Sequence, residues 1–203
     1  MRTILCNDTP VVPNTLFCIG RNYVEHIKEL DNDIPESPVF FFKPNSTLAE
    51  ILHVSKQNEP IHYEAEIVFV VGEEGYKAVG IGLDLTKRAL QSELKAKGLP
   101  WERAKAFRGA ALLSPCTGFT CKENLRLELW INNVLAQEGG TGQMLYKPES
   151  ILEELRLFVD VSENDLVFTG TPKGVGVVRI GDVFVGKLYE GEQLLVEQTW
   201  RAC

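Results

Sequence analysis

The alternation of apolar and polar positions along the chain predicts many short strands. Runs rich in β-branched and aromatic residues are separated by Gly, Pro, Asn and Asp, which is typical of strands joined by turns. Strands are expected at residues 16–19, 39–42, 61–71, 125–131, 134–137, 166–169, 183–188 and 193–199. The dipeptides Asn132-Asn133 and Glu190-Gly191 separate neighbouring strands and read as two-residue turns. Two hairpins, and mainly antiparallel pairing, follow from this spacing.

Helical patterns are fewer. They cover residues 22–30, 86–97 and 148–159. Gly98 and Pro100 end the second of these helices, and Pro148 lies in the first turn of the third. These helices are too few and too irregularly spaced for a repeating βαβ array. The pattern therefore predicts an α+β fold of curled or stacked, mainly antiparallel sheet with a few peripheral helices. Since no repeat or Pro/Gly/Ser-rich linker divides the chain, residues 1–203 are expected to form a single domain.

The strand expected at 61–71 places two acids ahead of an apolar run. Glu64 and Glu66 share one face of this strand, and the same face continues through Val68 and Val70 into the expected core. Two like charges about 7 Å apart on a buried face are costly unless a cation or several donors neutralise them. A positive group is therefore expected nearby. The alternative is that the two acids lie on the solvated face of an amphipathic strand.

Asp84 is a third acid in an apolar frame. It stands between Leu83 and Leu85 at a strand end, just before the helix expected at 86–97, and could instead be the N-cap of that helix. Together with Glu64 and Glu66 it would form a site made only of oxygen ligands. Such a site suits Mg²⁺, Mn²⁺ or Ca²⁺ better than Zn²⁺.

Three further features carry candidate chemistry. His26 and Glu29 are three residues apart, so the carboxylate could orient the imidazole and raise its basicity, although a solvated pair on a helix surface has the same spacing. The stretch DLVFTGTPKGVG predicts a strand that runs into a glycine-rich turn, whose backbone N–H groups could bind an anion. It fits neither the Walker nor the dinucleotide-binding pattern, and it could be an ordinary turn. Lys105 could be a catalytic residue or a surface lysine.

Composition and charge limit the kinds of molecule that the protein is expected to bind. The net charge is −7 and the pI is about 5.1, with no run of Lys or Arg, which argues against nucleic acid and anionic membranes as partners. A small molecule or another protein remains. The five cysteines include no CxxC pair, and the chain has neither a membrane-length apolar run nor a signal-peptide pattern near its start. We therefore expect a cytoplasmic protein.

The order of motifs resembles the fumarylacetoacetate hydrolase family, in particular its small single-domain acylpyruvate hydrolases, oxaloacetate decarboxylases and oxaloacetate tautomerases. The matching stretches are CIGRNYVEHIKEL, PVFFFKP, HYEAEIVFVVG, GLDLT, KGLPWERAKAF, QEGGTGQM and DLVFTGTPKGVG. The resemblance implies a β-sandwich roll, a homodimer, and Mg²⁺ or Mn²⁺ held by Glu64, Glu66 and Asp84. It also implies a His26–Glu29 catalytic dyad on a helix that orders over the substrate as a lid. The remaining implied roles are catalysis by Lys105 and substrate binding by Arg21, Arg88, Gln91 and Thr171.

One stretch departs from the family pattern. Arg108 follows AKAF where these relatives usually have Asp, which raises a question about substrate preference and about the packing beneath Lys105. The resemblance implies an enzyme that acts on small 2-oxo or 2,4-dioxo acids through a metal-stabilised enolate. Hydrolysis of acylpyruvates and decarboxylation of oxaloacetate are expected ahead of isomerisation, by oxaloacetate tautomerisation or a hydroxymuconate-type reaction. The competing class is a non-catalytic β-domain that binds Ca²⁺.

Overall fold

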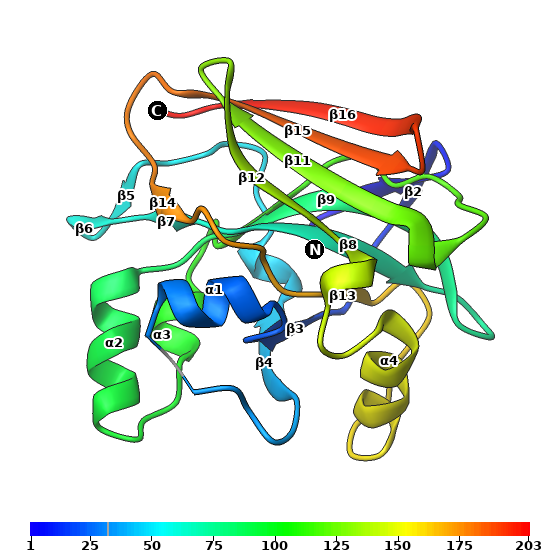
Figure 1. Cartoon of the computed structure of the whole chain (residues 1–203), viewed down its shortest axis with the longest axis horizontal. Helices are drawn as coiled ribbons and strands as arrows, with labels where there is room; N and C mark the ends of the chain where they lie inside the picture. Colours follow the sequence, from blue (N-terminus) through cyan, green and yellow to red (C-terminus); the bar gives the residue numbers. More distant parts are fainter. Residues whose placement is uncertain (32) are drawn as a thin grey trace.

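Two β-sheets stacked against each other form the body of the protein in the computed structural model, which describes residues 1–31 and 33–203 (Figure 1). The larger sheet has the strand order β10 (Ala111–Leu113), β9 (Tyr76–Asp84), β8 (Ala65–Val71), β13 (Leu166–Phe168), β3 (Thr15–Gly20) and β4 (Val39–Pro44). The smaller sheet has the order β12 (Val134–Gly140), β11 (Leu125–Ile131), β15 (Val183–Glu190) and β16 (Gln193–Arg201). Neighbouring strands in both sheets are antiparallel, except that β13 is parallel to β3.

Three pairs of very short strands complete the β-structure in the part of the chain that the structure describes. They are β1 (Ile4–Cys6) with β2 (Thr9–Val11), β5 (Ser55–Lys56) with β6 (Glu59–Pro60), and β7 (His62–Tyr63) with β14 (Gly176–Val177).

Four α-helices of the described residues lie at the periphery: α1 (Val24–Glu29), α2 (Arg88–Ala96), α3 (Glu102–Lys105) and α4 (Pro148–Arg156). Figure 1 shows α1, α2 and α3 grouped on one side of the larger sheet, with α4 apart from them. Short 3₁₀ turns occupy Asn45–Thr47, Lys122–Asn124 and Thr141–Gln143. None of the described helices combines the length and the apolar character needed to cross a membrane.

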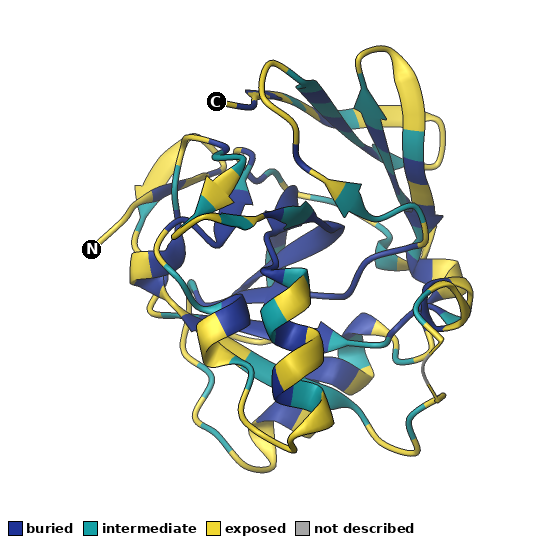
Figure 2. Ribbon diagram, turned by 90° about the vertical axis from the view of Figure 1, so that its left-hand side faces the viewer, coloured by how far each residue is buried: buried dark blue, intermediate teal, exposed yellow. Residues whose placement is uncertain are grey.

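Strand β8 is buried on both faces, which explains its near-continuous apolar sequence (Figure 2). Ile67 and Phe69 point into the main core between the two sheets, where they meet side chains of β11 and β15. Val68 and Val70 point the other way, into a second and smaller core with residues of β3 and β13. The face that carries Glu66 is therefore a core face, as the alternation predicted.

The mainly antiparallel α+β architecture and the eight expected strands are confirmed, with local differences. The segment 61–71 is divided into β7 and β8, with Glu64 between them. The Asn132-Asn133 turn is present, and both residues have the positive φ that such a turn requires. The second turn is shifted by one residue. Glu190 pairs with Gln193, so the central positions are Gly191 and Glu192, and Gly191 supplies the positive φ of 57°.

Candidate metal centre and active site

Three buried carboxylates converge at one end of the larger sheet. Each of Glu64, Glu66 and Asp84 offers an oxygen atom, and these atoms all lie within 4.8 Å of one another. Strand pairing brings them together, because Glu66 lies opposite Gly82 in the register of β8 and β9, and the Asp84 N–H donates to the Glu64 carbonyl at 2.8 Å. The three residues are no more than 5 % exposed. The inward orientation is confirmed, and a solvated strand face is excluded.

Asp84 does not cap the helix that follows it. Helix α2 begins at Arg88 and its N-cap residue is Lys87. The intervening Thr86 pairs through its backbone with His62, which delays the start of the helix by two residues relative to the expected position. Asp84 is the last residue of β9, and its side chain belongs to the carboxylate cluster.

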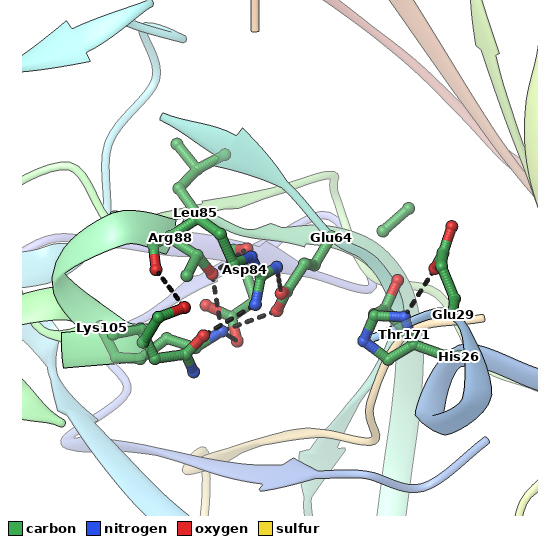
Figure 3. Close-up of polar contacts among 12 residues, drawn as sticks. His26, Glu29, Glu64, Asp84, Leu85, Arg88, Lys105 and Thr171 are labelled. Carbon is green, nitrogen blue, oxygen red and sulfur yellow. Dashed lines mark hydrogen bonds and ion pairs between the residues drawn. The ribbon is translucent and has the colours of Figure 1, made fainter. Parts of the chain in front are cut away.

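The positive group expected beside the acids is a set of three cations, of which Figure 3 labels Lys105 and Arg88. Lys105 Nζ lies 2.6 Å from Glu64 Oε2 and 2.8 Å from Asp84 Oδ2. Arg88 pairs with Glu64 from the first turn of α2. Lys43 Nζ lies 2.7 Å from Asp84 Oδ1 on the β4 side of the cluster. These contacts offset the large cost of removing the carboxylates from water.

Sequence reasoning assigned no role to Lys43, although its motif was recognised. The side chain is 0 % exposed, and its ammonium also donates to the Ala110 carbonyl at 2.6 Å. A signal was available, because Lys43 ends the apolar run VFFFK of a strand and a buried ammonium requires a negative partner. The sequence does not say which carboxylate is that partner, since Asp84 is distant in the chain.

Mutual interactions shift the pKa values of the cluster in opposite directions. Burial alone raises the pKa of Glu64, but the neighbouring Lys105 and Arg88 outweigh it and hold the pKa below its usual range. Burial raises the pKa of Glu66, and repulsion by the Asp84 and Glu64 carboxylates raises it further. Burial by itself would lower the pKa of Lys105, but the Asp84 and Glu64 carboxylates raise it overall. Lys105 is thus a fixed cation and hydrogen-bond donor at neutral pH.

The donor set fits a hard divalent cation. All three side chains offer carboxylate oxygens, which Mg²⁺ and Mn²⁺ prefer over softer ligands. Glu66 in particular accepts a hydrogen bond from the Gly170 N–H at 2.8 Å but forms no ion pair with a cation of the described chain. A divalent ion would relieve the repulsion that raises the pKa of this carboxyl.

His26 and Glu29 form a hydrogen-bonded pair on α1, with His26 Nδ1 3.0 Å from Glu29 Oε2. The other carboxylate oxygen, Glu29 Oε1, accepts from the Gly174 N–H at 2.9 Å. His26 is only 7 % exposed and faces the pocket that also contains the carboxylates, so it is not part of a solvated surface pair. Because Nδ1 is engaged by Glu29, the second ring nitrogen is the one that can exchange a proton with a substrate.

The glycine-rich turn after β13 binds carboxylates of the protein itself. Gly170 donates to Glu66 and Gly174 donates to Glu29, and the two glycines have φ values of +88° and +99°. A Cβ atom at Gly174 would lie 2.0 Å from the Ala136 carbonyl oxygen, so only glycine fits there. The anions that this turn binds are therefore the carboxylates of Glu66 and Glu29.

Thr171 is held in place by a residue that sequence reasoning missed. Gln137, a buried residue of β12, donates from Nε2 to Thr171 Oγ1 at 2.8 Å and accepts from the Ala65 N–H at 2.9 Å. The smaller sheet thereby contacts both β8 and the glycine-rich turn. The signal available was the position of Gln137 at the start of QEGGTGQM, one of the stretches that carry the family resemblance.

One pocket collects these side chains. Arg88 and Gln91 reach it from one face of α2 and are joined by a 2.7 Å hydrogen bond. Glu29 lies behind His26, outside the lining. Arg108 is exposed and does not disturb the packing beneath the buried Lys105. The predicted site residues that line the pocket are Arg21, His26, Glu64, Glu66, Asp84, Arg88, Gln91, Lys105 and Thr171.

Comparison with known proteins agrees with this geometry. Residues 15–197 match the model of the fumarylacetoacetate (FAA) hydrolase C-terminal family. The chain belongs to the fumarylacetoacetate hydrolase family. Within this family it is 36 % identical to oxaloacetate tautomerase YcgM of Escherichia coli, over 86 % of this chain and 87 % of the relative. It is 33 % identical to a mitochondrial oxaloacetate decarboxylase of Dictyostelium discoideum, over 83 % of this chain and 85 % of the relative.

Solved structures of the family share the fold. A candidate fumarylacetoacetate isomerase/hydrolase from Oleispira antarctica superposes with a TM-score of 0.96 at 31 % identity, and the match covers 100 % of both chains. Fumarylpyruvate hydrolase from Pseudomonas aeruginosa, solved with Mn²⁺ and pyruvate, superposes with a TM-score of 0.89 at 27 % identity, covering 99 % of this chain and 95 % of that one. The expected family and fold are confirmed, and the chain is an enzyme of a family that acts on ketonic acids.

Proposed function

We propose that this protein is a divalent-metal-dependent enzyme that converts small 2-oxo and 2,4-dioxo acids through an enolate. The observation that carries the proposal is the convergence of the carboxylates Glu64, Glu66 and Asp84, the cation Lys105 and the imidazole of His26 in one pocket. A structural Ca²⁺ site would require the carboxylates but neither a buried lysine nor an oriented imidazole beside them.

The proposed resident ion is Mg²⁺ or Mn²⁺, and the Mn²⁺ in a related fumarylpyruvate hydrolase supports this choice. Held by the three carboxylates, the ion would supply Lewis acidity at the 2-oxo group of the substrate. Lys105 provides a fixed positive charge at the same end of the pocket, where negative charge develops as an enolate forms. Thr171 and Arg88 lie on the pocket wall and would orient the carboxylate and oxo groups.

His26 supplies the proton transfer. In tautomerisation the proton leaves the enol oxygen and a proton is added to the adjacent carbon, and His26 would exchange protons with the substrate. In hydrolysis of an acylpyruvate, His26 would take a proton from the attacking water, the C–C bond would break, and the pyruvate enolate would leave. Decarboxylation of oxaloacetate gives the same enolate with loss of CO₂ and needs no water attack.

Among these reactions we rank keto–enol tautomerisation of oxaloacetate first. Support comes from the relatives that carry this activity in their names, including the Escherichia coli protein and the mitochondrial proteins of Bos taurus and Schizosaccharomyces pombe. This reverses the order expected from sequence, in which hydrolysis and decarboxylation came first. The decarboxylase of Dictyostelium discoideum and the fumarylpyruvate hydrolase structure keep those two reactions as second candidates.

One experiment tests the proposal. The purified protein, loaded with Mn²⁺ or Mg²⁺, is assayed with oxaloacetate and with acetylpyruvate. Loss of the enol absorbance and release of pyruvate are followed separately. A tautomerase removes the enol absorbance of oxaloacetate faster than it releases pyruvate, whereas a decarboxylase or a hydrolase releases pyruvate from its substrate. If neither compound changes faster than in buffer containing the metal, the proposed function is wrong.

We also propose a homodimer in the cytoplasm, as the family resemblance and the cysteine pattern suggest. Light scattering after gel filtration measures the first, and fractionation of the source cells measures the second.

A further inference from the structure

Gln137 lies where the smaller sheet meets the glycine-rich turn. It belongs to β12, is only 1 % exposed, and contacts Thr171 without lining the pocket that contains the carboxylates. Both ends of its side-chain amide are hydrogen-bonded. Oε1 accepts from the Ala65 N–H at 2.9 Å, and Nε2 donates to Thr171 Oγ1 and to the Pro172 carbonyl, each at 2.8 Å. The two N–H groups and the carbonyl of the amide are therefore all engaged.

The neighbours of this amide allow only one orientation of it. The Ala65 N–H can only donate, so the amide atom that faces it must be the oxygen. The Pro172 carbonyl can only accept, so the amide atom that faces it must be the nitrogen. Rotating the amide by half a turn would oppose two donors at one end and two acceptors at the other. Since all these groups are buried, that arrangement is excluded by its cost.

The orientation of the amide decides how the Thr171 hydroxyl can be used. An amide nitrogen offers no acceptor, so Thr171 Oγ1 must accept the hydrogen bond from Gln137, and its own hydrogen must point elsewhere. Within the described part of the chain, Thr171 Oγ1 has one other polar contact, the Pro172 carbonyl at 3.4 Å. That distance is long for an O–H···O bond, and the carbonyl already accepts from Gln137. Because Thr171 lines the pocket, its hydrogen is available to a ligand.

We propose that Gln137 is a positioning residue that makes Thr171 a hydrogen-bond donor toward the pocket, so that the site selects a ligand with an acceptor oxygen at this position. The inference rests on the proposed function, in which Thr171 orients the substrate, and adds the residue that sets the direction of this hydrogen bond. Ala65, which holds the other end of the amide, stands between Glu64 and Glu66 in the chain. One buried side chain thus fixes the donor relative to the strand that carries these carboxylates.

A double-mutant cycle tests the coupling, with calorimetric titration of the Mn²⁺-loaded protein by pyruvate, the simplest 2-oxo acid. Thr171→Val removes the hydroxyl at nearly constant shape and should weaken pyruvate binding about tenfold, as expected for a hydrogen bond to a charged group. Gln137→Met should weaken it about threefold to tenfold, and the double variant should bind as Thr171→Val does, because Gln137 acts through Thr171. Thr171→Ser keeps the hydroxyl and should restore most of the affinity. Losses that multiply in the double variant would overturn the inference.

Gln137→Glu tests the direction of the hydrogen bond. A carboxylate offers only acceptors, so the Thr171 hydrogen would turn toward it and leave only lone pairs facing the pocket. Gln137→Glu should therefore bind pyruvate more weakly than Gln137→Met, although glutamate is closer in shape to glutamine. A purely structural role predicts the reverse order. In the Thr171→Val background this difference should shrink by about threefold or more. An equal difference in both backgrounds would show repulsion by the added charge and overturn the argument from direction.

Gln143→Met is the matched control. Gln143 follows β12, is exposed, accepts from the Gly140 N–H at 3.0 Å, and does not line the pocket. Its replacement also removes a glutamine that bonds the backbone, but pyruvate binding should not change. A loss as large as that in Gln137→Met would show a general loosening of this segment and contradict the positioning role.

Thermal unfolding of the metal-free variants gives a readout that needs no ligand. Because Gln137 and Thr171 are hydrogen-bonded to each other, their Tm losses should be less than additive in the double variant. Additive losses would overturn the contact on which the inference depends. The predicted coupling in pyruvate binding, without turnover of any candidate substrate, would count against the proposed function alone. A parental protein that binds no pyruvate would overturn the role of Thr171 as a donor to the ligand.

Discussion

At the scale of single residues, Glu66 combines burial, like-charged neighbours and a single backbone donor, Gly170. This arrangement suits a metal ligand and is unfavourable for the protein alone. We expect Glu66→Gln to weaken Mn²⁺ binding at least tenfold and to stabilise the metal-free protein. Each kcal/mol gained should raise Tm by about 2–4 °C at this chain length. Calorimetry and thermal unfolding of metal-free samples measure the two effects.

The sign of the pH dependence follows from the raised pKa of Glu66. The folded state holds this proton more tightly than the unfolded state, so its stabilising contribution is present below the ordinary carboxyl pKa of 4.5 and is lost as the pH rises through the folded pKa. The Tm advantage of Glu66→Gln should therefore grow with rising pH. An advantage that shrinks from pH 5 to pH 8 would contradict the repulsion among the three carboxylates.

Lys105 acts at the step that all the candidate reactions share. Its charge is fixed by Glu64 and Asp84, so Lys105→Met removes a cation aimed at the developing enolate. The variant should lose about 10² to 10³ in kcat for tautomerisation, decarboxylation and hydrolysis alike. Circular dichroism and thermal unfolding check that the variant folds. A loss confined to hydrolysis would assign Lys105 to water activation instead.

His26 is expected to discriminate between the reactions. His26→Ala should lower the rate of acylpyruvate hydrolysis by a factor of about 10² to 10⁴. In the described part of the chain, no other base forms the hydrogen bond with Glu29 that orients His26. Decarboxylation needs no activated water and should be less affected. Mn²⁺ binding should be retained, because the imidazole is not among the carboxylate ligands. Parental hydrolysis rates in His26→Ala would remove the imidazole from the mechanism.

At the scale of elements, α1 and the glycine-rich turn act as a pair, since Glu29 joins His26 to the Gly174 N–H. Gly174→Ala would place a methyl group 2.0 Å from the Ala136 carbonyl oxygen, so the turn must move and the hydrogen bond to Glu29 should break. We expect a lower Tm and a loss of the reactions that depend on His26.

Gly181→Ala is the control for this effect. Gly181 has a comparable φ of +83°, but a Cβ atom there would meet no atom within 4 Å. It should cost about 1 kcal/mol from backbone strain alone and leave activity unchanged. Equal Tm losses and equal activities for the two variants would show that the Gly174 contact has no catalytic consequence.

Elements were also the scale at which the sequence was most informative. Period-two alternation located β8 and the face that carries Glu66, and the positive φ of Asn132-Asn133 is what a tight hairpin demands. The sequence could not predict the partners of Lys43 and Gln137, because each contact joins strands that are distant in the chain. Alternation gives the face on which a side chain lies but not the strand that packs against it. The family resemblance supplied the remaining roles.

At the scale of the whole molecule, the metal centre links both sheets, since Gln137 of the smaller sheet bonds Ala65 beside the carboxylates. Metal binding should therefore stabilise the fold as one unit. Mn²⁺ at one hundred times its Kd should add about 2.7 kcal/mol and raise Tm by about 5–10 °C, and EDTA should reverse the change. Scanning calorimetry with and without EDTA measures this shift. Two separate transitions, of which only one responds to Mn²⁺, would contradict the coupling.

The ion pair between Lys43 and Asp84 has a consequence for how the family can diverge. Neither side chain reaches water, and Asp84 also pairs with Lys105, so the two replacements are not equivalent. Replacing Asp84 alone leaves the buried Lys43 ammonium with carbonyl acceptors only, and an uncompensated buried charge typically costs about 3–5 kcal/mol. A natural sequence with a neutral residue at position 84 is therefore expected to have lost the lysine at position 43 as well, together with this metal centre.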